Sequence, residues 1–171
     1  AVQLDFGKVL TASVAYGRPV DADAFTATNQ DGYIATLGYK MGVTDLAAGY
    51  YNFKNYSAEG DREIWTVGAT AEVAKNVSLV GEYLKSNDEN LAGDDDGYVA
   101  GLSYKGASAS DKGSFGIWAK YYDQANTTYF GASHTTDATH EALDAAIAGG
   151  FKGYGVGANY TLAKNIVANV E

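Results

Sequence analysis

The stretch Tyr33-Ile34-Ala35-Thr36-Leu37-Gly38-Tyr39 alternates between two sets of side chains, with Tyr, Ala, Leu and Tyr at its odd positions. A period of two is typical of a β-strand whose two faces differ. The segments with this pattern are rich in Tyr, Val, Thr and Gly, and Gly and β-branched residues are poor helix formers. We therefore predict an all-β chain with eight full strands. Besides this stretch, the alternation occurs at 10–16, 46–50, 65–73, 77–83, 98–104, 115–121 and 154–160.

The composition of the 171 residues narrows the class of protein. Twelve Lys and Arg against 21 Asp and Glu give a formal net charge of −9, which argues against nucleic acid as a partner. The absence of Cys excludes disulfides and thiolate metal sites. Fourteen Tyr, six Phe and two Trp accompany a mean hydropathy of only −0.21. That combination is typical of an antiparallel up-and-down transmembrane β-barrel, which is apolar on one face only.

The connections between the predicted strands alternate in length. We expect short ones near 42–45, 74–76, 107–113 and 162–165, and long ones at 17–32, 54–63, 86–97 and 123–152. Outer-membrane barrels have this asymmetry between periplasmic turns and extracellular loops.

Aromatic residues on the apolar face gather at the long-loop end of every predicted strand. Amphipathic rings favour membrane interfaces, so we interpret the row as an aromatic belt facing outer-membrane lipid. A second, partial row of Tyr39, Tyr104, Phe115 and Tyr160 lies at the short-turn ends. The alternative is aromatic packing in the core of a soluble β-sandwich. The belt comprises Tyr16, Tyr33, Tyr50, Trp65, Tyr83, Tyr98, Tyr121 and Tyr154.

Both ends of the sequence continue the pattern. A turn at Gly7-Lys8-Val9 makes residues 1–6 the tail of a preceding strand, and residues 163–166 repeat the Lys-Asn turn of 74–77. We therefore expect eight full and two partial strands, forming an internal part of a larger barrel in one domain, 1–171. The alternative is a closed eight-stranded structural or adhesion barrel without an open pore. The many glycines predicted to point inward would leave that interior underfilled, which favours the larger barrel.

Two strand-turn-strand segments resemble those of a known family. Tyr160-Thr-Leu-Ala-Lys-Asn-Ile-Val-Ala-Asn-Val-Glu171 and Ala74-Lys-Asn-Val-Ser-Leu-Val-Gly-Glu-Tyr83 are similar to units of bacterial outer-membrane porins, especially the S-layer-homology-linked major porins of diderm Firmicutes. The resemblance implies a 16-stranded, homotrimeric, water-filled barrel in the bacterial outer membrane, without cofactor. It implies passive diffusion of small hydrophilic solutes and ions. It also implies a cell-wall tether through a domain outside these residues.

The face opposite the belt would line the pore and decide what passes. Its charges combine three bases with two acids, and three aromatic residues lie nearby. The alternative is a hydrated wall without particular selectivity. The predicted pore-lining residues are Lys40, Glu72, Glu82, Lys105, Lys120, Tyr51, Trp118 and Tyr122.

The long connection 123–152 is the strongest candidate for a constriction. Residues 137–148 have a helical pattern that places Asp137, Glu141 and Asp144 on one face. Gly153, Gly155 and Gly157 would leave bare wall where another backbone can approach. We predict that this loop folds into the lumen and that its carboxylates narrow the pore opposite the lysines. The alternatives are a surface loop or a clasp on a neighbouring subunit.

The remaining polar clusters indicate no chemistry. The acidic run at Asp94-Asp95-Asp96 lacks the spacing of an EF-hand, and a solvated run is favoured over a calcium site. His134 and His140 lie near Asp137 in sequence, but nearness within a loop is not a catalytic geometry. We predict no catalytic residues, no metal site and no enzymatic activity.

Overall fold

The computed structural model describes residues 2–7, 9–18, 31–57, 60–88, 93–128 and 150–171. These residues form ten strands and one short 3-10 helix, η1 (Asn126–Thr128). The prediction of an all-β fold with eight longer strands and a short one at each end is confirmed. The strands are β1 (Val2–Phe6), β2 (Leu10–Gly17), β3 (Gly32–Met41), β4 (Thr44–Ser57), β5 (Gly60–Ala74), β6 (Val77–Ser86), β7 (Asp96–Lys105), β8 (Phe115–Gln124), β9 (Phe151–Ala163) and β10 (Ile166–Val170).

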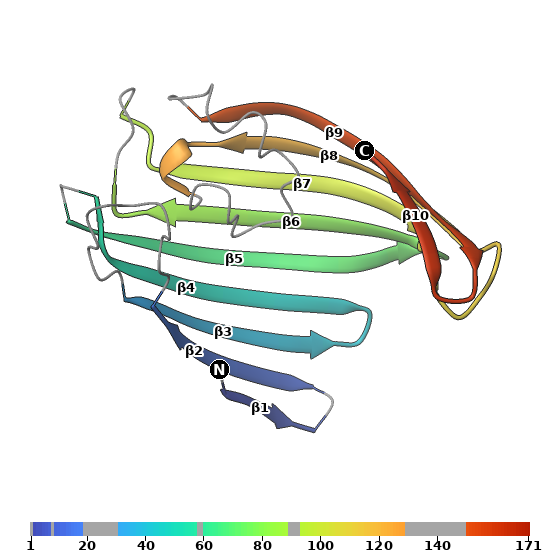
Figure 1. Cartoon of the computed structure of the whole chain (residues 1–171), viewed down its shortest axis with the longest axis horizontal. Helices are drawn as coiled ribbons and strands as arrows, with labels where there is room; N and C mark the ends of the chain where they lie inside the picture. The colour runs from blue at the N-terminus through green and yellow to red at the C-terminus, as the bar shows by residue number, and fades with distance from the viewer. Residues whose placement is uncertain (1, 8, 19–30, 58–59, 89–92, 129–149) are drawn as a thin grey trace.

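All ten strands belong to one antiparallel sheet whose spatial order follows the chain, from β1 to β10. The sheet is curved, and β1 and β10 lie at its two edges without pairing to each other (Figure 1). The alternative of a barrel closed by eight strands is therefore wrong for this structure. Its two end strands, β2 and β9, pair instead with β1 and β10.

Short turns gather at one end of the sheet, which we call the turn end, and the other connections define the long-loop end. Gly42-Val43, Lys75-Asn76 and Lys164-Asn165 each reverse the chain in two residues. Asn76 and Asn165 have φ of 62° and 65°, a left-handed conformation that Asn tolerates better than most residues. The repeated Lys-Asn sequence thus forms the repeated turn that we predicted.

The prediction of a long loop at 54–63 is wrong. β4 continues to Ser57 and β5 begins at Gly60, and Lys54 and Asp61 form an ion pair between the two strands. Backbone pairing continues here although the apolar alternation has ended. Hydrophobic periodicity detects only the half-buried part of a strand, so it ended β4 too early and began β5 too late.

The two faces of the sheet have opposite chemistry. The apolar face carries the alternate residues that include Val14, Leu37 and Val67, and most of its large side chains are exposed, up to 82% at Tyr154. The polar face carries Thr, Ser, Gly and charged residues, yet Leu84 and Val99 on this face are at most 6% exposed. The accessible surface of 10811 Å² exceeds the roughly 8,000 Å² expected of a compact protein of 18.0 kDa. The large side chains of the apolar face therefore do not form a core, and the buried apolar cluster of Leu84, Val99 and Tyr122 lies on the polar face.

Candidate functional site

The eight belt residues all lie on the apolar face, near the long-loop end of β2, β3 and β6 to β9 but in the middle of the longer strands β4 and β5. Across each long connection they are direct partners in the sheet, and their rings touch in several pairs. The ring centroids of Tyr50 and Trp65 are 4.3 Å apart, and those of Tyr121 and Tyr154 are 5.0 Å apart. The aromatic residues thus form a nearly continuous row across β2 to β9.

The row is oblique to the strands. At each hairpin closed at the turn end, the next belt residue lies two positions closer to the turn end than its neighbour. This step equals about 6.6 Å along the strands for every about 9.6 Å across them, which is a slope of about 35°. The step has the same direction in all three hairpins, so the row is straight. The partners that define it are Tyr50 with Ala35, Tyr83 with Val67, and Tyr121 with Ala100.

A polar row borders the aromatic row on its long-loop side. The Tyr83 hydroxyl donates to Asp96 at 3.1 Å, and the Lys152 ammonium lies 2.6 Å from Asp123. At the connection between β2 and β3, two hydrogen bonds hold the pKa of Asp31 below its ordinary value. The larger effect comes from Arg18 and the smaller from Tyr16. Four belt hydroxyls, those of Tyr16, Tyr83, Tyr98 and Tyr121, thus donate to carboxylates on the long-loop side.

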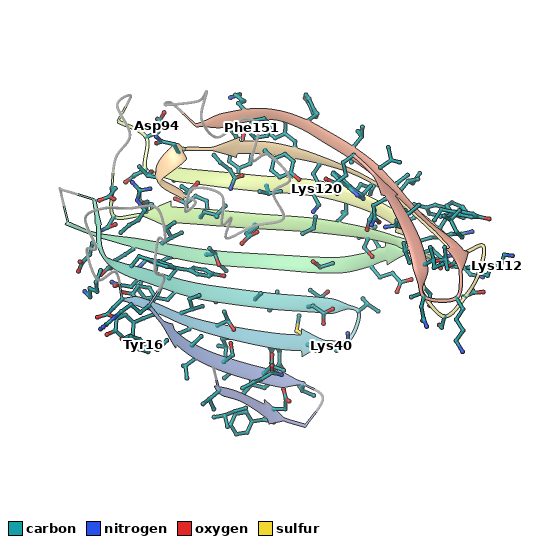
Figure 2. All side chains as sticks on the ribbon, in the orientation of Figure 1. Tyr16, Lys40, Asp94, Lys112, Lys120 and Phe151 are labelled. Carbon is teal, nitrogen blue, oxygen red and sulfur yellow. The ribbon has the colours of Figure 1, made fainter. Side chains whose placement is uncertain are left out.

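The predicted pore-lining residues all belong to the polar face by strand register, but they fall into two groups. Lys40, Glu72 and Lys105 lie at the turn end. Lys40 pairs with Asp45 at 3.1 Å, and the Glu72 carboxylate accepts a hydrogen bond from the Asn76 backbone. Figure 2 shows Lys40 and Lys112 at this end, and Tyr16 and Asp94 at the opposite one.

Lys105 departs from the orientation that alternation predicts. It ends β7 with φ of 57°, and its ammonium lies 4.5 Å from the ring centroid of Phe115, a residue of the apolar face. A positive φ redirects the side chain, so strand parity does not apply at this position. Its ammonium therefore reaches the rim of the sheet.

Further from the turns, the structure brings Glu82 and Lys120 together on the polar face. Glu82 is half-buried and interacts electrostatically with Lys120, whose ammonium is 5.3 Å from the Trp118 ring centroid. The Tyr51 side chain hydrogen-bonds Thr66 and also lies within electrostatic range of Glu82. Figure 2 shows Lys120 in the middle part of the sheet, and strand register places Glu82 between Gly68 and Val99 on the same face.

The glycines of β9 have a different neighbour from the one we predicted. A Cβ on Gly157 would lie 2.5 Å from the Trp118 ring, and one on Gly155 would lie 3.2 Å from both Trp118 and Tyr122. Within the described part of the chain, this bare wall is occupied by aromatic rings of β8 and not by a second backbone. Sequence reasoning identified the space but not its occupant.

The first residues of the long connection 123–152 pack onto the polar face. The Ala125 backbone N–H donates to the Asp96 carbonyl, and η1 lies against β6 and β7. Thr128 is fully buried, as is Leu84 of β6 on the polar face, whereas Tyr83 on the apolar face is 42% exposed. The predicted constriction residues Asp137, Glu141 and Asp144, and both histidines, lie outside the described residues.

Within the described ranges, no three His, Asp or Glu side chains lie close enough together to hold a metal ion. In the acidic run, Asp95 pairs with Lys85 and Asp96 with Tyr83. No helix among the described residues is long and apolar enough to cross a membrane. No protein-family model matches the sequence, and no curated protein is significantly similar to it.

Proposed function

We propose that this sheet is part of an outer-membrane porin, a passive diffusion channel for small hydrophilic solutes and ions. Its apolar face would contact lipid and its polar face would line a water-filled lumen. In this proposal further strands close the sheet into a larger barrel, 16-stranded and homotrimeric as the porin resemblance implies, with a cell-wall tether elsewhere in the protein.

The oblique aromatic row is the observation that carries the proposal. A membrane interface is flat, so a belt that follows it crosses tilted strands at a constant slope. Strands of transmembrane barrels tilt by roughly 35–45°, and the slope of about 35° derived from strand register agrees with this range. A soluble sandwich core gives no reason for aromatic residues to follow such a line.

The exposed apolar face and its polar border support the same assignment. Large apolar side chains span all ten strands on one face, where water would make them costly. On the long-loop side of the belt, Asp31 accepts a hydrogen bond from the Tyr16 hydroxyl, and Lys85 pairs with Asp95. Along the strands, an apolar band is followed by amphipathic rings and then by ion pairs. A membrane has the same order, from its acyl chains through its interface to water.

Conductance tests the proposal most directly. The natural full-length protein, reconstituted in planar lipid bilayers, is expected to give stepwise, ohmic currents, and liposomes that contain it should swell in small sugars. Folded protein in the membrane that passes no current would contradict the channel. A protein that folds to its native sheet in buffer without detergent or lipid would contradict the membrane assignment.

The charges at the middle of the polar face give a sharper test. Lys120→Glu should raise the cation-to-anion permeability ratio, and Glu82→Gln should lower it, because fixed charges beside a narrow aqueous path repel ions of their own sign. Val43→Glu, in the exposed β3–β4 turn, is the control for the first variant and should change the ratio less. Identical ratios in all three variants would contradict a lumen at this face.

A further inference from the structure

The connection between β7 and β8 differs from the other connections of the turn end. It runs through 106–114, nine residues, because β7 ends at Lys105 and β8 begins at Phe115. Two residues suffice for the neighbouring hairpins, as at Lys75-Asn76. Chain reversal therefore does not explain the length of this segment, which we call the strap.

The first half of the strap crosses the polar face of β8 and β9. A Cβ on Gly116 would lie 2.7 Å from the Cα of Gly106, so glycine is required where the chain passes over β8. The Ala107 N–H then donates to the Asn159 side chain of β9 at 2.9 Å. The Ala109 carbonyl finally accepts from the Asn165 backbone, in the β9–β10 turn, at 2.7 Å.

A buried threonine fixes the strap to the sheet. Thr161 of β9 is fully buried, and its hydroxyl donates to the Ser108 carbonyl at 3.0 Å. The Ser114 hydroxyl lies 3.1 Å from the same Thr161 oxygen and accepts from the Ser108 N–H. Buried polar groups that are satisfied in this way hold one arrangement, so the strap has a defined position over the polar face.

The strap also forms one wall of a polar cavity of about 660 Å³. The opposite wall is Glu72 with the β5–β6 turn, and the strap contributes Asp111 and Lys112. Lys105 lies between them. Two acidic and two basic residues thus line a space at the end of the polar face.

We infer that the strap is a charged constriction at the turn-end mouth of the proposed pore, where hydrated ions pass between Glu72, Asp111 and Lys112. The inference rests on the proposed channel. It places a narrowing at the opposite end of the sheet from the long connection 123–152, held by backbone hydrogen bonds to β9. The strap narrows the mouth at β8 and β9, and its charged tip acts on passing ions of both signs.

Thiol modification in the natural full-length protein tests the strap. Ser110→Cys introduces a thiol beside Asp111 in a sequence whose 171 residues contain no Cys, so the reagent meets no other thiol in this region. Attachment of a cationic methanethiosulfonate should lower conductance and shift selectivity toward anions, and an anionic one should lower conductance and shift selectivity toward cations. Val43→Cys is the control, because Val43 is 66% exposed in a two-residue turn at the same end.

The outcomes separate the inference from the function on which it rests. Opposite selectivity shifts in the Ser110→Cys protein and none in the Val43→Cys protein would support the strap. Complete labelling of the Ser110→Cys protein, verified by mass, with conductance and selectivity unchanged would overturn the strap but not the channel. Absence of current from the unmodified protein would overturn both. Replacing 106–113 by Asn-Gly is a second variant, expected to raise single-channel conductance if its spectrum shows an intact sheet.

Discussion

The two faces of the sheet belong to the same strands and the same backbone pairing, but they differ in how far their large side chains are exposed. On the apolar face Tyr154 is 82% exposed, whereas on the polar face Tyr122, one strand away, is 2% exposed. Trp118 and Tyr122 lie over the glycines of β9, and no comparable cover lies over the apolar side chains within the described residues. Burial in this sheet is therefore decided by face and by glycine placement, not by hydrophobicity.

The largest expected effect separates lipid from water outside the apolar face. Ala69→Arg and Thr70→Arg place the same cation on neighbouring, exposed positions of opposite faces. If lipid covers the apolar face, Ala69→Arg costs roughly 2–4 kcal/mol near the bilayer midplane, and Thr70→Arg costs much less. Unfolding from lipid vesicles by denaturant measures both. Equal costs would contradict a difference in surroundings between the two faces.

The next effect tests the aromatic packing of the polar face. Gly157→Ala adds a Cβ 2.5 Å from the Trp118 ring, and overpacking of this kind costs about 1–3 kcal/mol. Gly81→Ala, on the apolar face of β6, is the matched control, since nothing lies within 4 Å of the added atom. The free energy of unfolding should fall for the first variant only. A stable Gly157→Ala protein would mean that Trp118 is free to move away.

A smaller effect is expected where the strap meets the polar face. Thr161→Val keeps the shape of the side chain but leaves the Ser108 carbonyl and the Ser114 hydroxyl without this partner, at about 1 kcal/mol for each net hydrogen bond. Thr11→Val, at an exposed position of the same face, is the control. Thermal unfolding compares them, and equal midpoints would show that the strap does not depend on Thr161.

The smallest effect concerns pH at the polar border of the apolar face. Because Arg18 and Tyr16 lower the pKa of Asp31 in the folded state, its stabilising contribution is complete above the ordinary pKa near 4. That contribution is lost as the pH falls through the folded-state value. Asp31→Asn should therefore lower the unfolding temperature slightly at neutral pH, with a difference that diminishes in acid as the Asp31 carboxyl is protonated. A difference that persists in acid would mean that charge is not its cause.

The alternation of side chains predicted the parts of the fold that depend on local pattern. It identified all ten strands, the Lys-Asn turns and the face of nearly every residue. It missed the strap, because the bond from Ala107 to Asn159 joins residues 52 positions apart and involves no apolar side chain. It also misjudged Lys105, where a left-handed backbone overrides strand parity.

The same distinction applies to the candidate site. Counting alternate residues along each strand was enough to assign residues to the polar face. It was also enough to identify Glu82 and Lys120 as charges of that face. The proximity of these two charges depends on the register between β6, β7 and β8, which no single segment contains. The signal that could have indicated the strap was a Ser-rich connection of nine residues at an end where two suffice.

The constant step of two residues per hairpin has a consequence for how such a protein changes in evolution. Each hairpin brings its own two belt rings and the same offset to the next, as at Tyr83 and Tyr98 followed by Tyr121 and Tyr154. Duplication or loss of a whole hairpin therefore keeps the belt straight, whereas a single added strand reverses direction and breaks it.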